Sequence, residues 1–357
     1  MKVLITGGCG FLGSNLAESF LEKENDVFII DSLRRVGSKE NLNWLESSSK
    51  KDNLKFFQAD ITNTKLINDL FQENGEFDFI CHVAGQVAMT TSIIDPRKDF
   101  EVNALGTFNI LEATRKFSPG ALLAFSSTNK VYGDLAYLEI LENESRYTLK
   151  DFPCGLDENT LLDFSTPYGC SKGSADQYVR DWGRVFGLKT VIFRHSSIYG
   201  GRQFATIDQG WVGWFCSKVL EQKYLSKINK TLVPFTISGN GKQVRDVLHS
   251  DDLINLYHCA FDNKETLNGE IFNIGGGFEN SLSILELIKV LEDLLSFHKI
   301  KYKTINRRAS DQDCFIANIN KAKDLLNWEP KVSYREGLKK MIDWSKTLIN
   351  EQDYQEG

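Results

Sequence analysis

A tyrosine and a lysine four residues apart are the strongest candidates for chemistry in this chain. They lie in the string Thr-Pro-Tyr-Gly-Cys-Ser-Lys at 166–172, where Thr166 as N-cap and Pro167 in the first turn predict the start of a helix. Tyr168 and Lys172 would then lie one turn apart on one face. A tyrosine titrates near pKa ~10, and it becomes a useful base only where positive charge stabilises its anion. The spacing therefore suggests a phenolate base beside an ammonium group.

A cluster of hydroxyl side chains follows a predicted strand at 121–125. These are Ser126, Ser127 and Thr128. In a parallel sheet, ligands bind outside the carboxyl ends of the strands, so the hydroxyls would face the same crevice as the tyrosine. We expect Thr128, Tyr168 and Lys172 to form one catalytic group.

A glycine-rich turn opens the chain, between an apolar strand at 3–5 and a helical pattern at 11–21. It fits a dinucleotide fingerprint in two registers, Gly8-x-Gly10-x-x-Gly13 and Gly7-x-x-Gly10-x-x-Gly13. Glycine permits the tight turn and the close approach of a pyrophosphate to the backbone, and the helix N-terminus favours its charge. A second strand, at 28–30, ends in Asp31, placed to bind the ribose hydroxyls. The stretch predicts a dinucleotide site.

The elements that position these groups alternate between strands and helices. Further strands are expected at 54–58, 77–83, 121–125 and 190–193, and helices at 63–74 and 96–116, the second with Phe100, Asn103, Phe108 and Leu111 on its inner side. Such βαβ units predict an α/β fold with a Rossmann-type, doubly wound parallel sheet.

The second half of the chain changes character after about residue 195, with loops rich in Gly, Trp and Gln and amphipathic helices at 284–295 and 334–348. We expect a dinucleotide-binding domain at 1–192, a smaller α/β substrate lobe at 193–350 interleaved with it, and a polar tail at 351–357. The long polar connection at 133–167 is expected to be functional or mobile rather than inert.

Composition excludes several classes of protein. The net charge of −6 comes without a basic block, which argues against nucleic acid and anionic membranes as partners. The seven cysteines are scattered and the five histidines show no ligand spacing, so neither disulfides nor a metal site is indicated. With no leader pattern and no long apolar run, we expect a cytoplasmic protein. We also expect His82 to be a satisfied core residue.

Several strings in the chain resemble those of one enzyme family. They are Thr-Gly-Gly-x-Gly-Phe-Leu-Gly at 6–13, Asp31, Asp60-Ile61, Ser126-Ser-Thr128, Tyr168-x-x-x-Lys172, the string at 193–200, Arg245-Asp-Val247, the string at 273–277 and Asn327-Trp-Glu-Pro330. In this order they are similar to the extended short-chain dehydrogenase/reductase family, and the likeness covers nearly the whole chain. The resemblance implies a nicotinamide cofactor and a nucleotide-sugar substrate.

The residues after the hydroxyl cluster bear on the type of reaction. The 4,6-dehydratases of the family carry a Thr-Asp-Glu string whose acids eliminate water, whereas this chain has Thr128-Asn129-Lys130. The resemblance therefore implies oxidation and reduction without elimination, as in an epimerase. The strings at 85–92, 128–134, 194–205 and 239–246 further resemble the CDP-paratose (CDP-tyvelose) 2-epimerases.

This likeness implies a specific reaction, the inversion of C2 of a CDP-3,6-dideoxyhexose through a transient 2-keto sugar and bound NADH, for surface polysaccharide (O-antigen) synthesis. Tyr168 would take the hydroxyl proton, Thr128 would hydrogen-bond the reacting oxygen, and Lys172 would also hold the nicotinamide ribose. Two alternatives stay open. One is C4 epimerisation of a UDP- or CDP-hexose by the same three residues, and the other is a dinucleotide-binding regulator without catalysis.

The remaining site residues follow from the motifs and the resemblance. For the cofactor they are Gly7, Gly10, Phe11, Leu12, Gly13, Asp31, Ser32, Asp60, Ile61, Ala84, Gly85, Gln86, Asn103, Ser126, Tyr168, Lys172 and His195, with Asn103 bracing the loop at 84–86 more than touching a ligand. For the CDP-linked substrate they are Thr128, Ser197, Arg202, Gln203, Arg245 and Arg308, the last two resembling the family's diphosphate-binding arginines.

Two further expectations concern the cofactor and the assembly. Asp31 favours NAD over NADP because a carboxylate repels a 2′-phosphate, although Arg34 and Arg35 could accommodate one. Relatives pair through long helices, so a homo-oligomer, dimer or tetramer, is expected, with 96–116 and 168–186 as the candidate surfaces.

Overall fold

A seven-stranded sheet forms the base of the molecule in the computed structural model, which describes residues 1–48, 50–308 and 310–349. The expected polar tail at 351–357 lies outside the described residues. All strand pairs of this seven-stranded sheet are parallel. The order across the sheet is β12 (Glu270–Ile274), β8 (Lys189–His195), β5 (Leu122–Thr128), β4 (Phe79–His82), β1 (Lys2–Thr6), β2 (Asp26–Asp31) and β3 (Leu54–Gln58). The strand order reverses between β1 and β4, as in a doubly wound Rossmann-type sheet.

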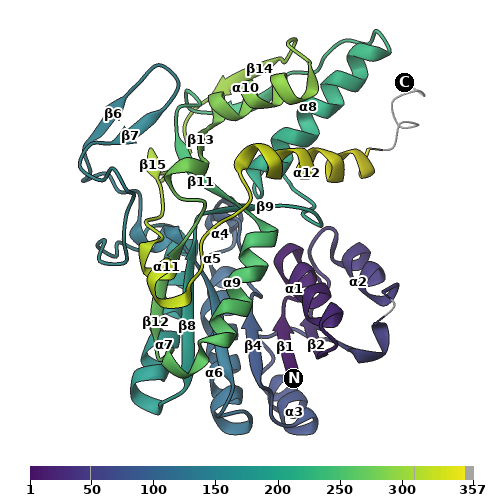
Figure 1. Cartoon of the computed structure of the whole chain (residues 1–357), viewed down its shortest axis with the longest axis vertical. Coiled ribbons are helices and arrows are strands. Elements are labelled where there is room, and N and C mark those ends of the chain that lie inside the picture. The colour runs from purple at the N-terminus through teal and green to yellow at the C-terminus, as the bar shows by residue number, and fades with distance from the viewer. Residues whose placement is uncertain (49, 309, 350–357) are drawn as a thin grey trace.

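Helices cover both faces of this sheet (Figure 1). One face is packed by α1 (Phe11–Glu22), α9 (Ser250–Asp262) and α11 (Asn320–Leu326), and the other by α3 (Thr64–Asn74), α6 (Gly106–Phe117) and α7 (Thr166–Phe186). The central strands β1, β4, β5 and β8 are buried on both sides, which explains their continuous apolar runs. The fold class predicted from the sequence is confirmed.

The second lobe packs around its own apolar core, above the carboxyl ends of the strands (Figure 1). It contains α8 (Trp211–Lys227), α10 (Ile284–Leu295), α12 (Tyr334–Thr347) and the paired strands β10 (Phe235–Ser238) and β14 (Tyr302–Ile305). A second sheet is formed by β13 (Ser281–Ser283), β11 (Val244–His249), β15 (Cys314–Phe315) and β9 (Ser197–Tyr199). None of the helices described in the chain is both long and apolar enough to cross a membrane.

The two lobes are interleaved along the chain. Strand β12 and helix α9 come from the second half of the sequence, yet they pack with the large sheet. The domain boundary expected at 192/193 falls inside β8, whose paired residues continue to His195. A cut at this position would separate residues of β8 that share one hydrogen-bonded ladder with β5.

The long connection at 133–167 contains regular structure. The connection at 133–167 contains an antiparallel hairpin, β6 (Ile140–Glu142) with β7 (Tyr147–Leu149). Arg146 anchors it through an ion pair of 2.7 Å with Glu286 of α10. The segment is therefore tied to the second lobe, which the polar sequence did not reveal.

The helix expected at 96–116 is interrupted. It consists of α5 (Pro96–Phe100), a π-helical turn η2 (Glu101–Leu105) and α6, preceded by α4 (Met89–Ile94). The wider π turn rotates the helix face. Phe100, expected to point inward, is 57% exposed, while Leu111 is buried.

Candidate functional site

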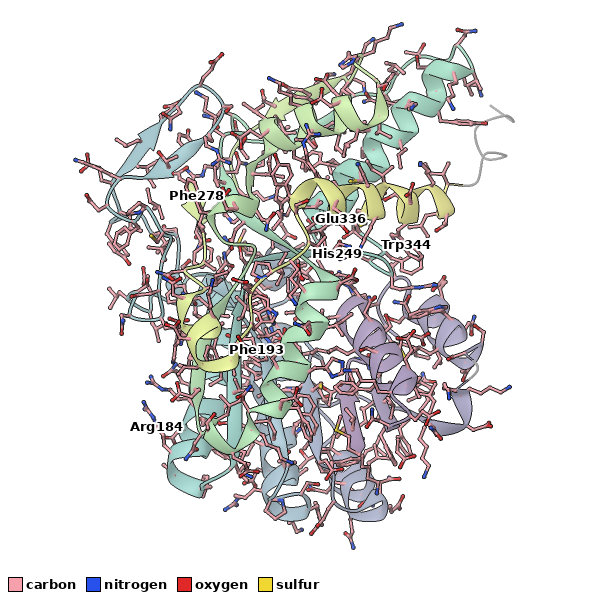
Figure 2. All side chains as sticks on the ribbon, viewed as in Figure 1. Arg184, Phe193, His249, Phe278, Glu336 and Trp344 are labelled. Atoms are coloured by element: carbon pink, nitrogen blue, oxygen red, sulfur yellow. The ribbon has the colours of Figure 1, made fainter. Side chains whose placement is uncertain are left out.

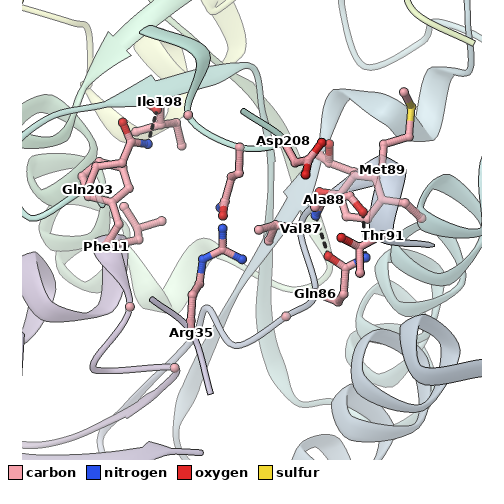
Figure 3. Close-up of a pocket in the computed structure, with 18 of the residues that line it drawn as sticks. Phe11, Arg35, Gln86, Val87, Ala88, Met89, Thr91, Ile198, Gln203 and Asp208 are labelled. Atoms are coloured by element: carbon pink, nitrogen blue, oxygen red, sulfur yellow. Dashed lines mark hydrogen bonds between the residues drawn. The ribbon is translucent and has the colours of Figure 1, made fainter. Parts of the chain in front are cut away.

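A cavity of about 690 Å³ opens where the carboxyl ends of the sheet strands meet the second lobe. It lies beside the reversal of strand order between β1 and β4, where ligands bind in open α/β sheets. One wall is formed by the glycine turn and the ends of β2 and β4, and the other by the loops after β8 and strands of the second lobe. Figure 3 shows Phe11 and Gln203 on one side of this space and Gln86 to Met89 on the other.

The glycine turn approaches the chain after β4 too closely for any side chain. A Cβ on Gly7, whose φ is +70°, would lie 2.8 Å from the Cα of Ala84, and one on Gly13 would lie 2.2 Å from the Gly7 carbonyl oxygen. Helix α1 begins directly after Gly10, and no side chain caps its first backbone N–H groups. These N–H groups of the first helical turn border the cavity, and the cradle fits the pyrophosphate of a dinucleotide.

Asp31 ends β2 beside this turn. Its carboxylate accepts hydrogen bonds from the backbone N–H of Leu33 at 2.8 Å and of Cys9 at 3.0 Å. Burial raises its pKa, and these backbone donors oppose the rise. The two predicted arginines differ in placement, because Arg34 forms an ion pair with Asp60 at 2.6 Å, whereas Arg35 points into the cavity.

Helix α7 brings Tyr168 to the floor of the cavity. The N-cap is Ser165 rather than Thr166, which is the first helical residue with a φ of +66°. The Thr166 hydroxyl still accepts a hydrogen bond from the N–H of Gly169 at 3.3 Å, so it caps the turn from inside the helix. The backbone N–H of Tyr168 donates to Ser92 Oγ at 3.2 Å.

The Tyr168 phenol is buried, and burial raises its pKa to about 12. A hydrogen bond with Thr128 lowers this pKa, whereas the negative charge of Asp99 raises it further. Thr128 lies at the end of β5 and also lines the cavity. In the protein alone the tyrosine is therefore a neutral phenol at pH 7, and it needs added positive charge to act as a base.

Lys172 is held in a different way from the expectation. Its ammonium donates to the Ser126 carbonyl at 2.6 Å and lies 4.1 Å above the ring of Phe125. Burial lowers the pKa of Lys172 to about 7, and the charges of Asp176 and Asp99 oppose this shift. The side chain lies beneath the wall of the cavity and is directed at strand β5 rather than at the phenol.

Two histidines lie at strand ends, and their surroundings differ. His82 is buried with both ring nitrogens hydrogen-bonded, to Thr6 Oγ1 at 2.6 Å and to Thr107 Oγ1 at 2.9 Å, so the expected satisfied core residue is confirmed. His195 lines the cavity, is 5% exposed, and has no hydrogen-bond partner at either nitrogen. Burial, together with the charge of Lys172, lowers the pKa of His195 to about 3. Buried polar atoms without partners indicate a ligand contact here.

Asn103 braces the loop after β4. Its Oδ1 accepts from the N–H of Gln86 at 2.9 Å, and its Nδ2 donates to the Gln86 carbonyl at 3.0 Å. The side chain is 1% exposed and lies outside the cavity lining. The structure therefore shows Asn103 shaping the loop after β4.

The second lobe and the turn after β5 contribute cations to the cavity. Arg245 forms an ion pair with Asp311 at 2.7 Å, and Lys130 reaches the same carboxylate at 3.4 Å. Burial lowers the pKa of Lys130 to about 8, and the charge of Arg245 acts in the same direction. Arg308 donates to the carbonyl of Ile207 at 2.9 Å. These side chains form a positively charged end of the cavity.

Arg202 has a role that the sequence did not suggest. Its guanidinium lies 3.9 Å from the ring centroid of Trp44 and 4.9 Å from that of Trp344. Trp44 belongs to α2 (Ser38–Glu46) and Trp344 to α12. The indole of Trp344 lies on the side of α12 that faces the first lobe (Figure 2). Gln203 is buried and donates to the Ile198 carbonyl at 3.1 Å. Both residues border the cavity, yet Arg202 holds the two lobes together.

The other predicted residues gather at the same place. The cavity is also lined by Gly10, Leu12, Ser32, Ile61, Gly85, Ser126 and Ser197. Trp211 and Trp214 pack against Phe215 and border the cavity as well. Sequence reasoning missed Asp208 and the wall at 87–89, because no local pattern marks a loop side chain that tertiary packing turns toward a ligand.

Comparison with known proteins agrees with this geometry. The family model described as GDP-mannose 4,6 dehydratase matches residues 4–341. The CDP-paratose 2-epimerase of Salmonella typhi is 53% identical over 98% of this chain and 100% of its own length.

Solved structures of similar proteins share the fold. A UDP-glucuronic acid 4-epimerase from Bacillus cereus, solved with UDP-glucuronic acid and NAD, has a TM-score of 0.80 and 28% identity over 98% of this chain and all of its own. A UDP-glucose 4-epimerase from Thermus thermophilus, solved with NAD, has a TM-score of 0.78 and 26% identity, with the same coverage.

Proposed function

Since the chain belongs to the GDP-mannose 4,6 dehydratase family of extended short-chain dehydrogenases/reductases, we propose that it is an NAD-dependent nucleotide-sugar epimerase. Its substrate is a CDP-3,6-dideoxyhexose, and it inverts C2, converting CDP-paratose to CDP-tyvelose for surface polysaccharide synthesis. The observation that carries the proposal is a buried Thr128–Tyr168 pair on the cavity, with no acid in the two positions after Thr128.

Those two positions favour a redox reaction without loss of water. Asn129 donates through Nδ2 to Gln312 Oε1 at 3.1 Å, and Lys130 pairs with Asp311. The Asn129 amide does not exchange protons at neutral pH, and Lys130 is held in its ion pair with Asp311, so the two positions lack the carboxyl groups that the resemblance assigns to a dehydratase. The 53% identity to an epimerase supports the same conclusion.

NAD is the cofactor in this proposal. The cradle of Gly7, Gly10 and Gly13 would hold its pyrophosphate, Asp31 would accept from the adenosine ribose, and His195 would lie at the nicotinamide end. When bound as NAD⁺, the cofactor supplies a reversible hydride acceptor, so that C2 passes through a keto state and is reduced from its other face.

Tyr168 moves the proton in each direction. As phenolate it accepts the proton of the C2 hydroxyl during oxidation, and as phenol it returns a proton to the C2 oxygen during reduction. Thr128, whose hydroxyl also lowers the pKa of Tyr168, orients the reacting oxygen. Because the neutral phenol is favoured in the protein alone, proton abstraction requires the positive charge of the oxidised ring. Lys172 would add its charge and hold the nicotinamide ribose.

The cationic end of the cavity supports a diphosphate-linked substrate. Guanidinium groups bind diphosphates well, because they are planar, permanently charged and bidentate. Arg245 and Arg308 both line this end. Cytidine as the base rests on the similarity to the Salmonella typhi protein.

Incubation with CDP-paratose in deuterated water tests the proposal. The expected result is interconversion with CDP-tyvelose and little deuterium at C2, because the hydrogen leaves and returns without exchange with solvent. Extensive deuterium incorporation at C2 would exclude the redox route. Mass spectrometry of the nucleotide released from the purified protein identifies the retained cofactor in the same preparation.

C4 epimerisation is the second candidate, because the solved structures described above are 4-epimerases. The same tyrosine and threonine would act on a hexose bound in another orientation. A panel of CDP-paratose, UDP-glucose and UDP-galactose separates the two reactions. Turnover of the UDP-hexoses with none of CDP-paratose would replace the C2 assignment by the C4 assignment.

A further inference from the structure

Asp99 is a buried carboxylate beneath the cavity that the mechanism above does not use. It lies in α5, is 1% exposed, and does not line the cavity. Its Oδ2 accepts from Ser171 Oγ at 2.5 Å, and its Oδ1 accepts from Gln86 Nε2 at 2.9 Å and from Asn103 Nδ2 at 3.3 Å. A single carboxylate thus joins three segments of the chain, namely the helical run at 96–105 that contains Asp99 and Asn103, helix α7, and the loop after β4.

These three segments surround the reacting groups. Ser171 precedes Lys172 in α7, and its hydroxyl also lies 3.2 Å from the Tyr168 carbonyl. Gln86 begins the loop that continues through 87–89 and forms one wall of the cavity (Figure 3). The third partner, Asn103, belongs to the π-helical turn and braces the same loop.

We propose that Asp99 is a positioning residue, which fixes the helix of Tyr168 and Lys172 against the loop at 84–89 and whose negative charge acts on both side chains. The inference rests on the proposed function, because that function makes the tyrosine–lysine pair the reacting machinery. Ser171 transmits the position of Asp99 to the helix, and Gln86 transmits it to the cavity wall.

The charges around Lys172 single out Asp99. The groups that face this ammonium are the carboxylates of Asp99 and Asp176 and the imidazoles of His82 and His195. Both imidazoles are neutral, because burial and the charge of Lys172 lower the pKa of each to about 3.

Asp176 already has a cationic partner, since Arg194 forms an ion pair with it at 2.8 Å and the pair is buried. Among the residues described, no lysine, arginine or histidine lies within ion-pair distance of Asp99. Its charge is held by hydrogen bonds alone, so its field acts on Lys172 and Tyr168 without a nearer cation to neutralise it.

The negative charge of Asp99 shifts the pKa of both neighbours in the same direction. A negative charge favours the protonated form of both neighbours, and Asp99 raises the pKa of Tyr168 and of Lys172. Removing the charge therefore makes both groups lose their protons at lower pH. A residue that only supports packing would not move these two titrations together.

The test compares Asp99→Asn, Ser171→Ala and the control Asp95→Asn, each as the NAD-bound protein. Asp99→Asn removes the charge at nearly constant shape, whereas Ser171→Ala removes the link to the helix and keeps the charge. Asp95 lies in the same region, and its Oδ1 caps α5 by accepting from the N–H of Lys98 at 3.0 Å. Asparagine caps a helix equally well, so Asp95→Asn changes the charge and little else.

We expect Asp99→Asn and Ser171→Ala each to lower kcat about 10- to 100-fold, because small displacements of reacting groups are costly. The pH profile of kcat should move to lower pH in Asp99→Asn and stay in place in Ser171→Ala. Wild-type kcat in both variants, or a reduced kcat in Asp99→Asn with an unmoved profile, would overturn the proposal.

Hydrogen–deuterium exchange of the amides at 84–89 provides a readout that needs no substrate. Exchange should become faster in Asp99→Asn and Ser171→Ala and remain unchanged in Asp95→Asn. Unchanged exchange in both of the first two variants would overturn the proposed link to the loop. If the wild-type protein failed to convert CDP-paratose, the proposed function would fail, while the exchange rates would still decide whether Asp99 holds the loop.

Discussion

The ammonium of Lys172 lies 2.6 Å from the carbonyl oxygen of Ser126, two residues before Thr128 on the same strand. This bond joins α7 to β5, and Thr128 at the end of β5 also acts on Tyr168 of α7, whose pKa it lowers. The three predicted catalytic side chains are thus held by a pair of contacts between one helix and one strand. Their relative positions depend on that packing rather than on the flexibility of any single side chain.

Lys172→Met should remove activity and raise thermal stability at low pH. Burial lowers the pKa of Lys172 from its ordinary 10.5 to about 7, so the unfolded chain binds more protons between these values, and wild-type stability rises with pH across that window. At pH 6 the variant should melt at a higher temperature than wild type, and this difference should shrink toward pH 10. Scanning calorimetry of the NAD-free protein checks this, with the exposed Lys39→Met as control. A constant difference across the pH range would contradict the argument.

Tyr168→Phe should retain the fold and bound NAD but lose at least about 100-fold in kcat, because the proton transfer has no other donor of matching position. Turnover of CDP-paratose and the NAD content of the purified variant are the measurements. Tyr178→Phe, on the exposed side of the same helix, is the matched control. Turnover near the wild-type rate in Tyr168→Phe would remove the phenol from the mechanism.

Arg245→Met should raise the KM for the nucleotide-sugar by about 10- to 100-fold, since a charge-assisted hydrogen bond contributes about 1.5–3 kcal/mol. The effect on kcat should be smaller, because the diphosphate does not change charge during the reaction. Arg307→Met is the comparison, since Arg307 pairs with Asp313 at 2.7 Å and lies outside the cavity lining. Equal effects of the two substitutions would show that Arg245 acts through general charge and not by direct contact.

Arg202→Gln should lower the melting temperature rather than raise KM. The guanidinium stacks on Trp44 and Trp344, and each cation–π contact is worth about 0.5–2 kcal/mol. Thermal unfolding should therefore show a loss that Arg184→Gln, an exposed arginine of α7, does not cause. An increase in KM without a change in melting temperature would instead support the sugar or phosphate contact expected from the sequence.

The sequence predicted local elements well where one pattern decides them. The strand at 54–58 and the helix at 284–295 have the expected limits, because their apolar spacing is set by neighbours in the chain. It missed β12, the hairpin at 140–149 and the π turn before α6. Strand β12 exists through its parallel pairing with β8, nearly eighty residues earlier, and no short window contains that partner.

The sequence by itself determined the kinds of groups at the site: a glycine turn, an acid after the second strand, and a tyrosine one helical turn before a lysine. Tertiary structure decided how they are used. It selected the register Gly7-x-x-Gly10-x-x-Gly13, since those three glycines line the cavity while Gly8 packs against Ile29. It also turned Lys172 toward the Ser126 carbonyl and placed Asp99 beneath the site. The first set follows from spacing along one segment, whereas the second depends on contacts between segments far apart in the chain, which spacing cannot encode.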